Sequence, residues 1–122
     1  MMNEGQQGNN ACACLDAETH FCGFEKKAIG VDDQYGEVTL WTCKRCGRQW
    51  IHYFIEYEYL TAAGRMFTGV LSPDVASRVT VDNATGLFDS LDWYFRGGSA
   101  FGGKLHRTTG PLQPWLTPFP GT

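Results

Sequence analysis

Two cysteines separated by two residues are the side chains of this sequence best suited to chemistry. Cys43 and Cys46 lie in the segment 41–50, and Gly47 follows the second of them. Two thiols at this spacing can bind one soft cation, and a glycine here allows the positive φ that brings backbone N–H groups close to the sulfurs. The pattern predicts half of a structural zinc site, because such a site is closed by four ligands in a tetrahedron.

The other cysteines, Cys12, Cys14 and Cys22, all precede this pair. The two halves of a four-cysteine zinc site are often roughly 15 to 20 residues apart. The 20 residues between Cys22 and Cys43 lie at the upper end of that range. Cys22 is also followed by a glycine, Gly23, as the second cysteine of the downstream pair is. We therefore expect Cys22 to be a third ligand.

The fourth ligand has three candidates. Thr19 stands where a second Cys-x-x-Cys pair would have its first cysteine. The fourth ligand must then be Cys14, Cys12 or His20. We favour Cys14 with Cys22, because the short loop between them can bring both sulfurs to one ion. The alternative uses Cys12 and Cys14 together, which gives Cys-x-Cys, 28 intervening residues and then Cys-x-x-Cys.

These motifs resemble those of zinc ribbons and zinc knuckles over residues 12–60. The resemblance implies a structural zinc ion within a small antiparallel sheet. The spacing of the alternative set also resembles the zinc centre of the redox-regulated heat-shock chaperone, in which four thiolates hold zinc until oxidation releases it. That second resemblance covers the four cysteines alone. A disulfide framework is disfavoured, because the cysteine count of 5 is odd and the sequence shows no secretory signal.

Length and composition predict one folded domain over residues 1–122 with an apolar core. The net charge of −3 is too small to indicate a nucleic-acid or membrane surface. The polar first ten residues contain no apolar segment of a signal peptide, and no later segment is long enough to span a membrane. We expect a cytoplasmic protein, where thiols stay reduced and available for metal.

The hydrophobic pattern predicts an α+β fold, a zinc-ribbon-like antiparallel β-sheet with one amphipathic helix and an irregular C-terminal wrap. Residues 1–11 are expected to be a flexible lead and residues 12–71 the zinc-binding sheet. Alternation and β-branched or aromatic residues predict its strands at 24–30, 37–42, 49–60 and 65–71.

The part of the chain after this sheet is expected to change period. Ser72 followed by Pro73 predicts a short helical turn within a helical part, residues 72–98. Apolar residues from Ala84 to Phe95 recur at helical spacing and predict the amphipathic helix. Prolines in residues 99–122 predict an irregular tail that packs on the domain through its apolar side chains, Leu112, Trp115, Leu116 and Phe119.

Four thiolates leave no open coordination position, so the predicted zinc is structural and the protein is not expected to be an enzyme. His52, Glu56 and Glu58 share one face of a predicted strand and could form an acid/base group. Alternating acids on a strand more often form a solvated face, which is the interpretation we prefer.

Three functional classes fit these features. The preferred class is a protein-binding module, such as an adaptor or an immunity protein that neutralises a toxin, with an acidic and aromatic surface of Glu56, Glu58, Asp89, Asp92, Tyr57, Tyr59 and Trp93. A nucleic-acid-binding zinc ribbon is less favoured, and it would use Lys44, Arg45, Arg48, Trp41 and Trp50. The third class is a thiol redox switch, in which the spare fifth cysteine attacks once zinc is lost.

Overall fold

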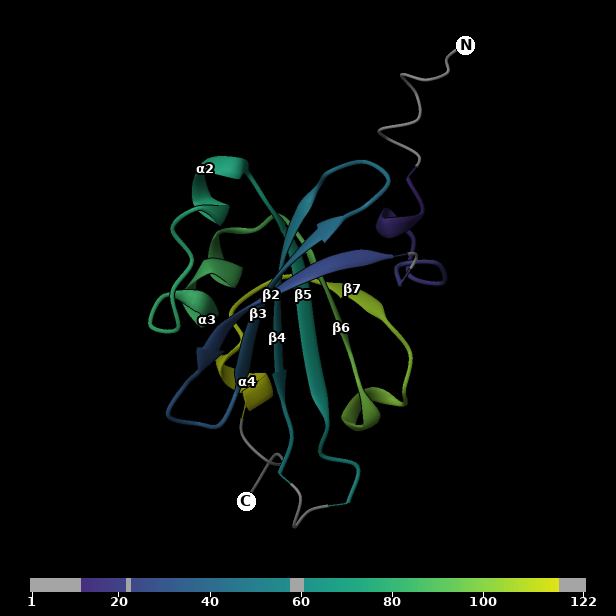
Figure 1. The fold of residues 1–122 in the computed structure, drawn as a ribbon. Helices are drawn as coiled ribbons and strands as arrows, with labels where there is room; N and C mark the ends of the chain where they lie inside the picture. Colours follow the sequence, from purple (N-terminus) through teal and green to yellow (C-terminus); the bar gives the residue numbers. More distant parts are fainter. Residues whose placement is uncertain (1–11, 22, 58–60, 117–122) are drawn as a thin grey trace.

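An antiparallel sheet organises the protein (Figure 1). The computed structural model describes residues 12–21, 23–57 and 61–116. Within these residues the sheet has six strands in the order β2-β3-β4-β5-β6-β7, each antiparallel to its neighbours. The strands are β2 (Phe24–Val31), β3 (Glu37–Cys43), β4 (Gln49–Ile55), β5 (Arg65–Leu71), β6 (Tyr94–Gly97) and β7 (His106–Thr108).

Short helices complete what is an α+β arrangement. They are η1 (Ala13–Leu15), α2 (Pro73–Ala76), α3 (Ala84–Leu87), η2 (Phe88–Ser90), η3 (Ser99–Phe101) and α4 (Gln113–Leu116). The predicted helical turn after Ser72 is confirmed as α2, where the Ser72 hydroxyl oxygen accepts a hydrogen bond from the backbone N–H of Val75 at 3.3 Å. None of the described helices is long and apolar enough to cross a membrane.

The two faces of the sheet are covered in different ways. Alternate strand residues such as Ile51, Tyr53 and Phe67 face the helices and form the larger core with Phe88 and Leu112. The intervening residues face the other side, where a smaller core forms between the strands and the segment 12–21. That smaller core contains Cys14, Trp41, Cys43, Trp50 and Phe95. Figure 1 shows η1 and its flanking loop on the side of the sheet away from α2 and α3.

The strand predictions for the first half of the chain are confirmed with shifted ends. β4 ends at Ile55, and the last part of the predicted strand, 58–60, lies outside the described residues. The turn between β2 and β3 is fixed by Asp32, whose carboxylate accepts hydrogen bonds from the backbone N–H of Gly36 and from the hydroxyl of the buried Tyr53. One carboxylate thus ties the turn to the core.

The single amphipathic helix predicted over residues 84–95 is wrong. α3 and η2 cover only its first half, and the chain becomes extended at Leu91, with φ −85° and ψ 142°. Tyr94 and Phe95 then begin β6, and both side chains are fully buried. They belong to different cores, because neighbouring strand residues point to opposite faces. Pairing with β5 also covers backbone groups that a helix would have left at a sheet edge.

The predicted irregular tail is also wrong in part, because it contains β7 and α4 as well as η3. Pro114 lies in the first turn of α4, where a missing N–H costs no helical hydrogen bond. Leu112 and Leu116 are buried in the larger core and Trp115 packs against it, which confirms the predicted packing of these side chains. Phe119 lies outside the described residues.

Replacing Phe88 tests the role of the η2 turn as part of the core. Phe88 is fully buried against Phe67 and Tyr94, so Phe88→Ala should lower the free energy of unfolding by about 3 to 5 kcal/mol. Its neighbour Asp89 is exposed, and Asp89→Ala should change the free energy by no more than about 0.5 kcal/mol. Chemical denaturation of the two variants checks this, and equal stabilities would contradict it.

Candidate metal centre

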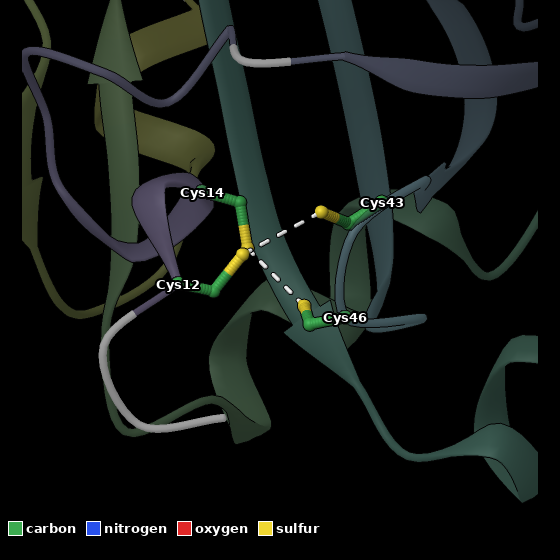
Figure 2. Close-up of side chains that lie close together, drawn as sticks. All are labelled: Cys12, Cys14, Cys43 and Cys46. Atoms are coloured by element: carbon green, nitrogen blue, oxygen red, sulfur yellow. Dashed lines mark hydrogen bonds between the residues drawn. The ribbon is translucent and has the colours of Figure 1, made fainter. Parts of the chain in front are cut away.

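Four thiols from two distant segments meet at one end of the smaller core (Figure 2). Cys12 and Cys14 come from the η1 segment, while Cys43 ends β3 and Cys46 lies in the turn that follows. The Sγ atoms of Cys12 and Cys43 are 3.7 Å apart, as are those of Cys14 and Cys46. All four Sγ atoms lie within 4.8 Å of one another. A zinc tetrahedron with Zn–S bonds of about 2.3 Å has sulfur–sulfur edges of about 3.8 Å, so this spacing suits such an ion.

Backbone hydrogen bonds shape the turn 43–48, which we call the knuckle. The N–H of Gly47 donates to the carbonyl oxygen of Cys43 at 2.9 Å, and the N–H of Cys43 donates to the carbonyl oxygen of Arg48 at 2.9 Å. Gly47 has a φ of +79°, which a glycine adopts at little cost. The knuckle therefore presents two sulfurs in the manner that the Cys-x-x-Cys-Gly motif predicts.

The upstream thiols are placed by a short helical turn and by a buried histidine. In η1 the N–H of Leu15 donates to the carbonyl oxygen of Cys12 at 3.0 Å. His20 is fully buried, and its Nδ1 donates to the carbonyl oxygen of Cys14 at 2.8 Å. The His20 ring lies among aromatic rings, with Trp50 at 4.7 Å between centroids and Phe95 at 5.1 Å. His20, which was a candidate ligand, thus anchors the loop and is not one of the four clustered residues.

The clustered thiols are those of the alternative ligand set. Cys12 and Cys14 join Cys43 and Cys46, whereas the favoured set used Cys22 in place of Cys12. Cys22 lies outside the described residues. The ribbon-like spacing before Cys43 favoured Cys22, whereas the Cys-x-Cys spacing of Cys12 and Cys14 was the signal for the cluster that the structure contains.

The surroundings of the thiols shift the pKa values of Cys14 and Cys43 in opposite directions. Burial raises the pKa of Cys14, and neighbouring thiols raise it further. Burial also raises the pKa of Cys43, but the backbone N–H groups of Cys46 and Arg45 oppose it and bring that pKa down to about 6. Cys43 is therefore ready to act as a thiolate near neutral pH. Because metal binding requires deprotonated sulfur, binding at Cys14 must displace a proton.

Beneath the loop 12–21 lie the aromatic side chains of Trp41, Trp50 and Phe95, which we call the aromatic floor. Trp41 is 5% exposed, with the His52 ring stacked on it at 4.0 Å and the Lys26 ammonium 4.3 Å from its centroid. Burial, with a smaller contribution from Lys26, lowers the pKa of His52 to about 3. His52 is therefore neutral at physiological pH and packs against this floor. Of the acids predicted to accompany it, Glu56 is exposed and Glu58 lies outside the described residues.

The basic and aromatic surface predicted for nucleic acid is divided by the fold. Trp41 and Trp50 are 5% and 0% exposed, which leaves them no face for stacking on bases. Arg48 donates a hydrogen bond to the Sγ atom of Cys46 at 3.3 Å. Lys44 and Arg45 remain exposed on the knuckle. Two exposed cations are a small electrostatic footprint for nucleic acid.

Comparisons with protein-family models, curated proteins and solved structures find no match to this chain. The resemblances to zinc ribbons and to the chaperone centre are therefore resemblances of cysteine motifs.

The low pKa of His52 predicts a loss of stability in acid. The unfolded chain binds a proton at this ring as pH falls through about 6.5, and the folded chain does not until pH approaches 3. Stability is therefore lost below about pH 6.5, by up to about 1.4 kcal/mol between pH 7.5 and 5.5. His52→Gln should remove this part of the difference in zinc-containing buffer.

His106 is exposed, so His106→Gln provides the control and should keep the wild-type pH dependence. Denaturation of each protein at both pH values makes the comparison. An unchanged pH dependence in His52→Gln would contradict the prediction.

Proposed function

We propose that this chain is a small, non-catalytic zinc-binding protein in which Cys12, Cys14, Cys43 and Cys46 hold one structural zinc ion. The observation that carries the proposal is the spacing of the four sulfurs, all within 4.8 Å of one another. That spacing is close to the edges of a zinc tetrathiolate, and a fold without a metal would have little reason to gather four thiols there.

Zinc is the ion that this ligand set suits best. Thiolates are soft ligands, and a tetrahedral group of four selects zinc or iron over hard ions such as magnesium and calcium. Four sulfurs also fill every position of a tetrahedral zinc ion, so no position is left for water or substrate. These arguments support a structural role rather than a catalytic one.

The zinc would replace regular structure that the N-terminal segment lacks. Between residues 12 and 21 the regular element is η1, which has 3 residues. The loop is attached to the sheet by the packing of the His20 ring on Trp50 and Phe95 and by the thiols. Arg107 of β7 adds a hydrogen bond from its guanidinium to the carbonyl oxygen of Leu15 at 3.1 Å. A metal bound by both segments would close this loop over the aromatic floor.

We further propose that the zinc-supported surface binds another protein, as an adaptor or an immunity protein would. Among the described residues three large apolar side chains are exposed. Phe21, 60% exposed, lies on the loop 12–21, whereas Val31 at 59% and Tyr35 at 78% lie at the end of the β2–β3 hairpin opposite Cys43. Aromatic residues of this kind supply much of the energy of protein interfaces. Of the surface predicted from sequence, Tyr57 and Trp93 pack against the cores instead, and Tyr59 lies outside the described residues.

A thiol switch is the second candidate, and the distances between the sulfurs favour it. With Sγ atoms 3.7 Å apart in two pairs, loss of the metal would leave thiols close enough to oxidise to disulfides with little movement. Reversible zinc release by peroxide would support this candidate. Zinc that stays bound until the chain unfolds would support the structural role alone.

Native mass spectrometry of the purified protein, with elemental analysis, tests the metal and its ligands. We expect one zinc ion per chain, lost on replacing any one of Cys12, Cys14, Cys43 and Cys46 by serine. Because structural zinc supplies roughly 10 kcal/mol or more of folding free energy, these variants should unfold at markedly lower temperature or fail to fold.

Cys22→Ser is the matched control and should keep both the zinc and the stability. The converse result, zinc retained in Cys12→Ser and lost in Cys22→Ser, would restore the ligand set favoured from sequence. Iron in place of zinc would contradict the identity of the metal, and a wild-type chain without metal would overturn the proposed function.

A further inference from the structure

Arg48 contacts both cysteines of the knuckle. Its guanidinium Nη1 donates to the Sγ atom of Cys46 at 3.3 Å, and its carbonyl oxygen accepts from the N–H of Cys43 at 2.9 Å. Arg48 is half-buried, whereas Lys44 and Arg45 on the same turn are exposed. One of the three knuckle cations is therefore held against the sulfur cluster.

The charge of a zinc tetrathiolate makes this contact important. Four thiolates and one divalent ion carry a net charge of about −2. Cys14 and Cys43 are 0% and 2% exposed, so much of that charge lies away from water. A hydrogen bond between a cationic donor and an anionic acceptor is roughly twice as strong as a neutral one. Arg48 is placed to neutralise part of the charge where the sulfur of Cys46 carries it.

Cys46 is also a point at which reagents can reach the cluster. It is half-buried, unlike Cys14 and Cys43. Together with Arg48 and Leu71 it lines an open hollow of about 320 Å³ between the knuckle and the start of α2. Cys12 is half-buried too, but no hydrogen bond from a cationic side chain to its sulfur is found among the described residues. The guanidinium thus lies beside the sulfur of the cysteine that lines this hollow.

We propose that Arg48 is a positioning residue of the metal site that protects the bond between Cys46 and zinc. The inference rests on the proposed function, because it requires a bound zinc ion. A thiolate that accepts a hydrogen bond from a guanidinium shares its electron density and is a weaker nucleophile. In alkylation by iodoacetamide the sulfur of Cys46 would attack the carbon, a carbon–sulfur bond would form, iodide would leave, and the weakened zinc–sulfur bond would break.

The test compares zinc-loaded wild type with Arg48→Ala, Arg48→Lys and Arg48→Gln, using Arg45→Ala as the control on the same turn. Iodoacetamide is neutral, so the charge of residue 48 does not change its approach. We expect zinc release, followed with a colorimetric indicator, to be about tenfold faster in Arg48→Ala, the lower end of the effect of an outer partner on a metal site. Peptide mapping should find Cys46 alkylated first.

The conservative variants separate charge from hydrogen bonding. Lysine keeps the charge and glutamine keeps a neutral donor, so Arg48→Lys should release zinc more slowly than Arg48→Gln if charge compensation dominates. Arg45→Ala should match wild type. A merely structural role for Arg48 would alter the unfolding temperature at saturating zinc and would not speed the alkylation of Cys46 relative to that of the other cysteines.

Two outcomes would overturn the inference alone. They are equal release rates in wild type and all three Arg48 variants, and first alkylation at a cysteine other than Cys46 in the Arg48 variants. Zinc content is measured beforehand on every protein. A wild-type chain that binds no zinc would instead overturn the proposed function, and this inference with it.

Discussion

Four sulfur atoms that approach within 4.8 Å of one another set the main constraint on this molecule. They join a segment with almost no regular structure to the β3–β4 turn, and nearly all of the smaller core lies beneath that connection. Sulfur pairs 3.7 Å apart carry no covalent bond, so without a metal the sulfurs attract one another only through thiol hydrogen bonds and van der Waals contact. Thiols are weak donors. A shared ion is the interaction that would make this arrangement strong.

The two faces of the sheet show why such an ion would be needed. Helices cover one face and contribute apolar side chains such as Ala76, Phe88 and Leu116 to its core. The loop 12–21 covers the other face and offers mainly Cys12, Cys14, Leu15 and Ala17 to the apolar contact. Small side chains bury little area, so the hydrophobic effect alone would hold this loop weakly. His20 is the largest side chain of this loop that is fully buried.

The sequence predicted those parts of the fold in which local pattern and tertiary structure agree. Alternating and β-branched residues identified β3, and β5 was identified as the strand that returns after β4 in a hairpin. The helix predicted over residues 84–95 was wrong, although the apolar residues of this segment recur at helical spacing. The last of them, Tyr94 and Phe95, belong to a strand that pairs with β5 and β7. Only the partner strands distinguish the two arrangements, and partners are not encoded in local spacing.

The sequence was enough to predict a metal site made of thiols, but not which cysteines form it. The spacing of Cys43, Cys46 and Gly47 was enough to predict the knuckle, because the turn that brings the two sulfurs together is local. The upstream pair depends on how a loop of ten residues, 12–21, lies on the sheet, which spacing does not specify. The role of His20 could not be predicted either, because a histidine can serve as a metal ligand or as a buried residue that fixes a loop.

If the proposed function is correct, the metal site and the exposed Phe21 are coupled, because Phe21 directly follows His20 in the loop. His20 is 0% exposed and anchors the loop inward, while its neighbour Phe21 is 60% exposed and lies edge-on to Trp41 at 6.0 Å. Zinc that holds the loop 12–21 on the sheet would therefore also fix the position of Phe21. Without the metal, the packing of the His20 ring and the hydrogen bond from Arg107 to Leu15 would have to position that side chain by themselves. A partner that binds at Phe21 would accordingly distinguish the zinc-loaded chain from the empty one without contacting the ion.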